Sequence, residues 1–137
     1  MHLSLSDKDL DKIIQEGLDE IDQETKTDEE IRERARFLTR DLMQGRNVKT
    51  SGFPDGSTWT IGSRTRKFFD KDGVEHHTVV LLCYNDARLK IHGPMYKPMM
   101  LEAEIDENYD MEQALEAAVT MFVAKQFGKM IVEQLDD

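Results

Sequence analysis

The sequence predicts an α+β domain with an N-terminal helical hairpin, an antiparallel sheet of about four to five strands, and a long C-terminal helix packed on the sheet. Apolar residues recur at helical spacing before residue 45 and after residue 110, and turn residues separate β-rich runs between them. A length of 137 residues fits a single domain. We divide it into residues 1–45 (hairpin), 46–105 (sheet) and 110–135 (C-terminal helix).

Two amphipathic segments form the predicted hairpin. Ser6 begins the first, and a capping box from Thr27 to Glu30 begins the second. Gly45 is typical of the residue that follows a helix. The apolar residues that share one face are Leu10, Ile13, Ile14, Leu18 and Ile21 in the first segment, and Ile31, Ala35, Leu38 and Leu42 in the second.

The predicted strands lie between clusters of turn residues. A continuous apolar centre in the run 74–84 predicts a central strand that is buried on both faces. The run 87–92 alternates between apolar and basic residues, so we expect a strand there, entered through a turn at Asn85-Asp86. The five runs are 57–61, 64–69, 74–84, 87–92 and 99–105.

The C-terminal segment begins with a predicted helix cap, Asp110 with Gln113 three residues later. It has apolar residues over more than one stripe of a helix. So wide an apolar face is typical of a helix that packs on a sheet or joins two subunits, and we predict a homodimer through it. Met95 and Tyr96, in a Met- and Pro-rich stretch, are candidates for a second adaptable contact surface. The interface residues predicted in the helix are Met121, Phe122, Phe127 and Met130.

Charge is unevenly distributed along the chain. The net charge is −10, which on average repels nucleic acid and anionic membranes. Residues 1–44 carry a net charge of −6 and residues 102–137 a net charge of −8, whereas residues 45–101 carry +4. The predicted sheet is therefore basic, and both predicted helical ends are acidic.

Basic side chains alternate along two of the predicted strands. If the two strands present them on the same side, one face of the sheet becomes an anion-binding or partner-binding strip. Three interpretations stay open: a solvated face balanced by the chain's own carboxylates, a surface for nucleic acid, and a surface for an acidic protein or small anionic ligand. The residues concerned are Arg64, Arg66, Arg88, Lys90 and His92.

Histidines provide the remaining chemical candidates. His2-Leu3-Ser4 and His76-His77-Thr78 both fit the pattern H-x-[ST]. This pair of motifs resembles that of the two-histidine phosphoesterases, which implies an acid and a base acting at a phosphate. The first motif departs from the family, where a strand and a helix normally precede it. Adjacent histidines on a strand face opposite sides, and the expected register places His92 opposite Val79, so we predict no metal site.

The function that we favour is a small acidic intracellular protein-interaction protein: an adaptor, a chaperone or an inhibitor. One variant is an inhibitor from a phage or mobile element, whose acidic helices imitate nucleic-acid phosphates and occupy a basic groove on a host protein. The alternatives are a binder of nucleic acid or a small anionic ligand, and a two-histidine phosphoesterase-like enzyme. We expect no catalytic residue and no cofactor, and favour a non-enzymatic protein.

The expected location is the cytoplasm, or a host cell's cytoplasm for a virus-encoded chain. No apolar run approaches the roughly 20 residues that a membrane helix needs, and the first residues lack the pattern of a signal peptide. The single cysteine, Cys83, lies in an apolar run, which favours a small buried side chain over a reactive thiol.

Overall fold

The computed structural model describes residues 26–128. The chain divides into two compact units, residues 1–30 and 31–137, and of the first unit only residues 26–30 are described. The first helix of the predicted hairpin lies outside the described residues. The second helix is present as residues 26–43, and Thr27 lies within it rather than at its N-cap, since residue 26 is already helical.

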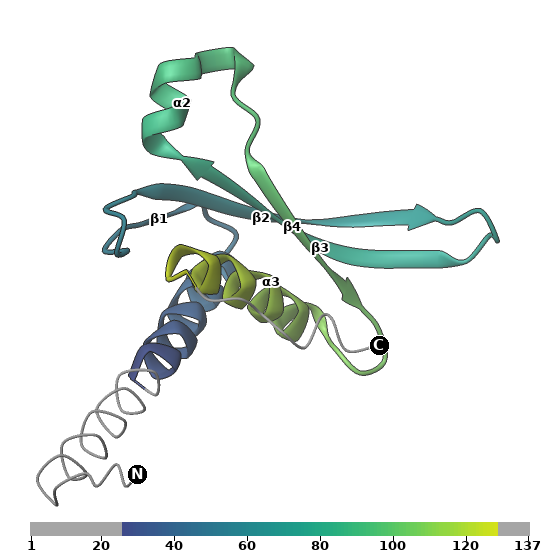
Figure 1. The fold of residues 1–137 in the computed structure, drawn as a ribbon. Helices are drawn as coiled ribbons and strands as arrows, with labels where there is room; N and C mark the ends of the chain where they lie inside the picture. The colour runs from purple at the N-terminus through teal and green to yellow at the C-terminus, as the bar shows by residue number, and fades with distance from the viewer. Residues whose placement is uncertain (1–25, 129–137) are drawn as a thin grey trace, which may run out of the picture. The chain divides into compact units, whose positions relative to one another are not determined.

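A four-stranded antiparallel sheet forms the centre of the second unit, in the order β1-β2-β3-β4 (Figure 1). The α+β class is therefore confirmed. The apolar run predicted to be central is β3, whose residues Val79, Val80 and Leu81 are all at most 2% exposed. The strands are β1 (Val48–Thr50), β2 (Trp59–Phe69), β3 (Glu75–Asn85) and β4 (Met99–Ile105).

Strand β2 is continuous where the sequence predicted two strands interrupted at Gly62-Ser63. It pairs with β3 from Trp59 opposite Asn85 to its far end. A Cβ atom on Gly62 would lie 2.5 Å from the Asn47 side chain, so this glycine admits a close approach within the strand. Strand β1 pairs only with the start of β2. The rest of β2 runs alongside β3 as a two-stranded ribbon, which ends in a hairpin turn (Figure 1).

The segment that follows β3 is a helix, α2 (Asp86–His92), so the strand predicted over 87–92 is wrong. The Asn85 side chain accepts a hydrogen bond from the backbone N–H of Arg88 at 3.2 Å and caps the helix. Asn85 and its neighbour therefore begin a helix instead of a hairpin turn. A short 3-10 helix, η1 (Gly93–Met95), comes next. Alternation over six residues is too short to distinguish a strand from one face of a short helix.

Helix α3 (Met111–Gln126) packs on one face of the sheet. The predicted capping box is confirmed: the Asp110 carboxylate accepts from the Gln113 backbone at 2.8 Å, and the Gln113 side chain accepts from the Asp110 backbone at 2.9 Å. The helix does not continue unbroken to residue 135, because it ends at Gln126 and Gly128 has a left-handed φ of 70°. Residues 129–135 lie outside the described part.

The core lies between the sheet and its helices. Residues 31–43 contribute the apolar stripe that was predicted for the second helix, with Ala35 fully buried. The largest fully buried side chain is Phe122, whose ring lies edge-on to Trp59 with centroids 5.2 Å apart. The other buried members from the sheet and α3 are Ile61, Val79, Leu81, Cys83, Ala114, Leu115, Ala118, Val119, Val123 and Ala124. Among the helices described, none is long and apolar enough to cross a membrane.

Candidate functional site

The five basic residues predicted to form one strip lie in two different places. Arg64 and Arg66 are on β2, on the face of the sheet away from α3, and we call this the open face. Arg88, Lys90 and His92 are on α2, beyond the end of β3. Arg64 pairs with Val80, five residues before the end of β3, which is roughly 16 Å along the strand. The five basic residues therefore do not form the single strip that the sequence predicted.

On the open face, one of the two arginines is paired with a carboxylate across the central strand. Arg66 lies 3.5 Å from Glu102 of β4 and 4.4 Å above the ring of Phe68. Val80, on the same face of β3, is fully buried although no helix within residues 26–128 packs on this face. Such a face matches the interpretation of a solvated surface balanced by the chain's own acids, with the glutamates of β4 supplying the balance.

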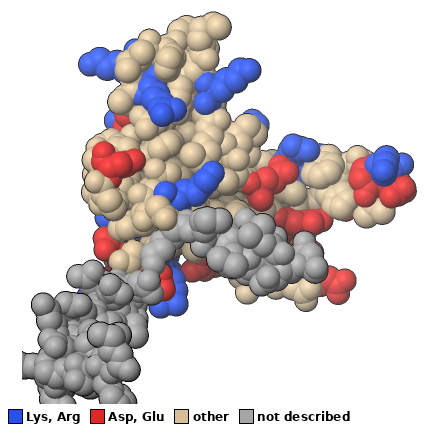
Figure 2. Space-filling view, in the orientation of Figure 1, with Lys and Arg blue, Asp and Glu red and all other residues tan. Residues whose placement is uncertain are grey.

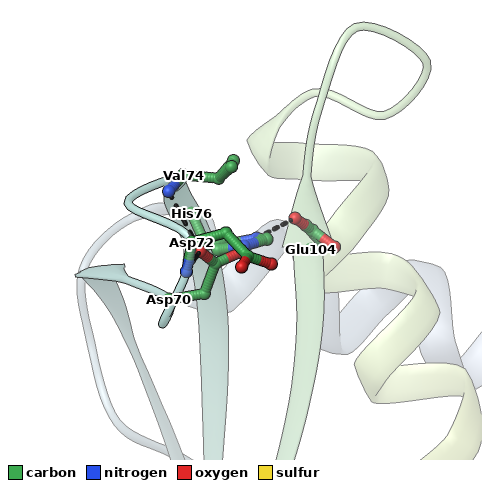
Figure 3. Close-up of polar contacts among 5 residues, drawn as sticks. All are labelled: Asp70, Asp72, Val74, His76 and Glu104. Carbon is green, nitrogen blue, oxygen red and sulfur yellow. Dashed lines mark hydrogen bonds and ion pairs between the residues drawn. The ribbon is translucent and has the colours of Figure 1, made fainter.

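A histidine clamp occupies the end of the open face (Figure 3). His76 Nδ1 lies 2.7 Å from Glu104 Oε1, and His76 Nε2 lies 2.8 Å from Asp70 Oδ2. The hydrogen bonds to Asp70 and to Glu104 raise the pKa of His76, because each carboxylate stabilises the imidazolium. Asp70 also accepts the backbone N–H groups of Asp72 and Val74, which closes the β2–β3 turn.

The clamp leaves little room for the chemistry implied by the phosphoesterase resemblance. Both ring nitrogens of His76 are hydrogen-bonded to carboxylates, and two carboxylates repel a phosphate. His77 lies on the opposite face, 3.5 Å from Glu75, and His2 is outside the described residues. Over residues 26–128, no group of three His, Cys, Asp or Glu side chains is placed to hold a metal ion.

The single thiol is also unsuited to chemistry. Cys83 is fully buried on the core face of β3. Burial raises its pKa to about 12, so the thiolate that would react is strongly disfavoured. The sequence-based expectation of a small buried side chain is confirmed.

The segment between β3 and β4 is largely exposed, and we call residues 86–98 the excursion. In Figure 1, α2 and η1 stand beyond the end of the sheet. Helix α2 buries none of its residues. Ile91 is 76% exposed and Met95 is 83% exposed. Leu89 and Met100, the latter at the start of β4, add further exposed apolar surface.

The base of the excursion is nevertheless firmly held. The Tyr96 hydroxyl accepts the backbone N–H of Asn85 at 2.8 Å, which ties the two ends of the excursion together. Asp86 accepts the Thr60 hydroxyl at 2.8 Å and lies 3.9 Å from Lys49. Tyr96 therefore anchors the segment: its side chain is only partly exposed, and its hydroxyl is hydrogen-bonded within the chain. Because the base is fixed, the exposed apolar residues of the excursion would lose little conformational entropy on binding.

Charge on the excursion has one dominant sign. Arg88, Lys90 and Lys97 are exposed, and none of them forms an ion pair within the described residues. The single acid of the segment is Asp86, whose carboxylate is already engaged at the base. Figure 2 shows basic side chains gathered over this end of the molecule, while acidic and basic side chains mix along the β2–β3 hairpin.

The interface residues predicted in the C-terminal helix lie mainly in the core. Phe122 is fully buried within the chain itself. Phe127 is partly buried and packs edge-on against Phe53, with centroids 6.0 Å apart. Met121 packs partly buried against the same core, and Met130 lies outside the described residues. The homodimer stays a prediction, but much of the apolar surface that suggested it is covered by the chain itself.

The sequence singled out five residues of the excursion without indicating that they belong to one segment. Arg88, Lys90 and His92 were assigned to a sheet face, and Met95 and Tyr96 to a separate contact surface. The sequence signal that could have placed them in one segment was a helix cap at Asn85.

Comparison of the chain with protein-family models, with curated proteins and with solved structures gives no match.

Proposed function

We propose that this chain is a protein-interaction protein and that the excursion, residues 86–98, is the surface that contacts its partner. The observation that carries the proposal is the pairing of a fixed base with an apolar tip. Tyr96 and Asn85 hold the base together, whereas Ile91 and Met95 at the tip are 76% and 83% exposed. Exposed apolar residues that cluster on an ordered projection are typical of contact sites.

The energetic argument supports a contact rather than a purely structural loop. Complete burial of an Ile or Met side chain contributes about 1.5–3 kcal/mol. Because α2 buries no residue against its own chain, that free energy is unused within the described structure. A partner that covers Ile91 and Met95 would gain it, and the pre-formed helix would lose little conformational entropy on binding.

The test compares proteins captured by the wild-type chain and by the double variant Ile91→Glu/Met95→Glu, using extracts of cells that make the protein. Captured proteins are quantified by mass spectrometry. Phe37→Glu is the matched control, because Phe37 is also an exposed apolar residue on a helix, 61% exposed, outside the excursion. Circular dichroism confirms that all three chains are folded.

We expect at least one protein to be retained by the wild-type chain and by Phe37→Glu but reduced more than tenfold by the double variant, since each buried glutamate costs more than the roughly 1.4 kcal/mol that a tenfold change represents. If the double variant retains every protein that the wild-type chain retains, the excursion is not the contact surface. The anion-binding alternative has less support, because Arg66 is already paired with Glu102 and the predicted strip is divided.

A further inference from the structure

We infer that the excursion binds an acidic amphipathic segment of a partner protein, one that interleaves apolar side chains with carboxylates. The inference rests on the proposed function and adds the chemistry of the partner. It follows from the way in which apolar and basic side chains lie side by side on one short helix and the residues after it.

The order of side chains along the excursion sets the pattern that a partner must match. On helix α2, Arg88 and Ile91 are three residues apart and share a face, and Leu89 and Lys90 lie between them in the sequence on the adjoining sides. All four are exposed. A purely apolar partner that covers Ile91 would also bury the neighbouring Arg88 without compensation, which is costly. A purely acidic partner would leave Ile91 in water. Both requirements are met by a segment that carries carboxylates beside apolar residues.

Charge complementarity favours such a segment because the excursion differs from the rest of the chain. The whole chain has a net charge of −10, yet residues 86–98 hold three Lys and Arg residues and one acid. That acid, Asp86, is engaged with Thr60 and Lys49 at the base. The attraction is therefore confined to one projecting site, and an acidic partner that reaches other surfaces of the chain is repelled there.

The same observations disfavour the other polyanions. A nucleic acid would need a basic track with several aromatic rings for stacking. Of the two rings in the excursion, Tyr96 is partly buried beside Tyr84 with its hydroxyl engaged, which leaves only His92 exposed. An anionic membrane would meet the net negative charge of the whole chain, and three cations offset little of it. A short acidic segment avoids both difficulties because it contacts the excursion alone.

The experiment titrates the full-length, isotope-labelled chain with synthetic probes and follows backbone amide resonances by NMR. The first probe is a peptide of about 18 residues with Leu at helical spacing and Glu elsewhere. Its two controls replace every Glu by Lys or every Leu by Gln. A single-stranded oligonucleotide and vesicles containing phosphatidylserine represent the other polyanions. Each titration is repeated with the variant Arg88→Glu/Lys90→Glu/Lys97→Glu.

We expect only the acidic amphipathic peptide to shift resonances of residues 86–98, with a dissociation constant on the order of 100 μM. The triple variant should weaken this binding at least tenfold, and raising the salt from about 50 to about 500 mM should weaken it severalfold. A control variant with the same change of charge, Arg32→Glu/Arg40→Glu/Arg46→Glu, should bind the peptide within about twofold of wild type, because all three residues are exposed on other segments.

Several results would overturn the inference. They are the absence of shifts at about 1 mM peptide, equal binding by the triple variant, or tighter binding of the oligonucleotide or vesicles at the excursion. Shifts of residues 86–98 that follow protein concentration alone would identify a second copy of the chain as the occupant. If the peptide fails while Ile91→Glu/Met95→Glu still loses a captured protein, the protein-interaction function stands and only the acidic chemistry of the partner is wrong.

Discussion

His76 of β3 lies 2.7 Å from Glu104 of β4, and this contact joins the ribbon formed by β2 and β3 to the edge of the sheet. The other ring nitrogen lies 2.8 Å from Asp70, which closes the turn at the end of the ribbon. The ring of His76 also stacks on Phe68, with centroids 5.1 Å apart. One imidazole therefore links a turn, a central strand and an edge strand.

The first prediction concerns the pH dependence of stability. The pKa of His76 is raised by Asp70 and Glu104, so its contribution is complete below the unfolded pKa of about 6.5 and is lost as pH rises through the folded pKa. The pKa of Asp70 is lowered, first by His76, so its contribution is lost as pH falls through that lowered value. The clamp should stabilise the fold most between about pH 4 and pH 6.5.

The measurement is the midpoint of thermal unfolding between about pH 4 and pH 9 for the wild-type chain and for His76→Asn. We expect the wild-type advantage over the variant to be largest near pH 5 and to shrink on the alkaline side. His77→Asn is the matched control, since His77 is on the other face and its side chain is 54% exposed. Parallel pH profiles for wild type and His76→Asn would show that the clamp contributes nothing.

The second prediction concerns Arg34, whose guanidinium lies 4.8 Å from the ring centre of Phe53 and 5.8 Å from that of Phe127. It also donates to the backbone carbonyl of Ser51. A lysine keeps the charge but loses the planar fork, so Arg34→Lys should reduce the free energy of unfolding by about 1–2 kcal/mol. Denaturant titration measures the loss. Arg36→Lys, on the exposed side of the same helix, should change it by less than about 0.5 kcal/mol.

The comparison of prediction with structure shows where local patterns are sufficient. Strand β4 begins at Met99 and ends at Ile105, as its alternation predicts, because half of the strand faces the core and half faces solvent. The capping box at Asp110 is likewise a local contact and is confirmed. Patterns that depend only on neighbouring residues therefore located most strands and the start of α3.

Non-local contacts account for what the sequence did not predict. A turn at Asn85 placed Val79 opposite His92, whereas the helical excursion places Val79 opposite Ala103. This change of register is what brings Glu104 to His76, 28 residues away in the sequence. The surplus apolar surface of α3 suggested a subunit interface because a sequence does not show which distant elements cover a helix.

The third prediction tests that coverage directly. Phe122 is fully buried and its ring lies 5.9 Å from that of Phe53, centre to centre. Phe122→Ala should reduce the free energy of unfolding by about 3–5 kcal/mol, since it leaves a cavity in the core. The loss should be the same at all protein concentrations, and Met111→Ala, at a position that is 42% exposed, should cost less than about 1 kcal/mol. A loss that grows with dilution would place Phe122 at a dimer interface after all.

The fourth prediction uses Cys83, the single cysteine of the chain. Its pKa is raised from 9.0 to about 12, chiefly by burial. The raised pKa lowers the thiolate fraction at pH 8, and burial also blocks access of a reagent to the sulfur. At pH 8, a thiol reagent should therefore label the folded chain at least a thousandfold more slowly than the chain in guanidinium chloride.

The labelling rate then becomes a measure of opening, because the sulfur reacts only when the core around β3 is exposed. Phe122→Ala should accelerate labelling in proportion to its loss of stability. Ile91→Glu/Met95→Glu should leave the labelling rate unchanged, because α2 has no buried residue and so adds little to the core. Fast labelling of the wild-type chain under native conditions would mean that Cys83 is reached without global unfolding. That result would contradict the close packing of the core face of the sheet.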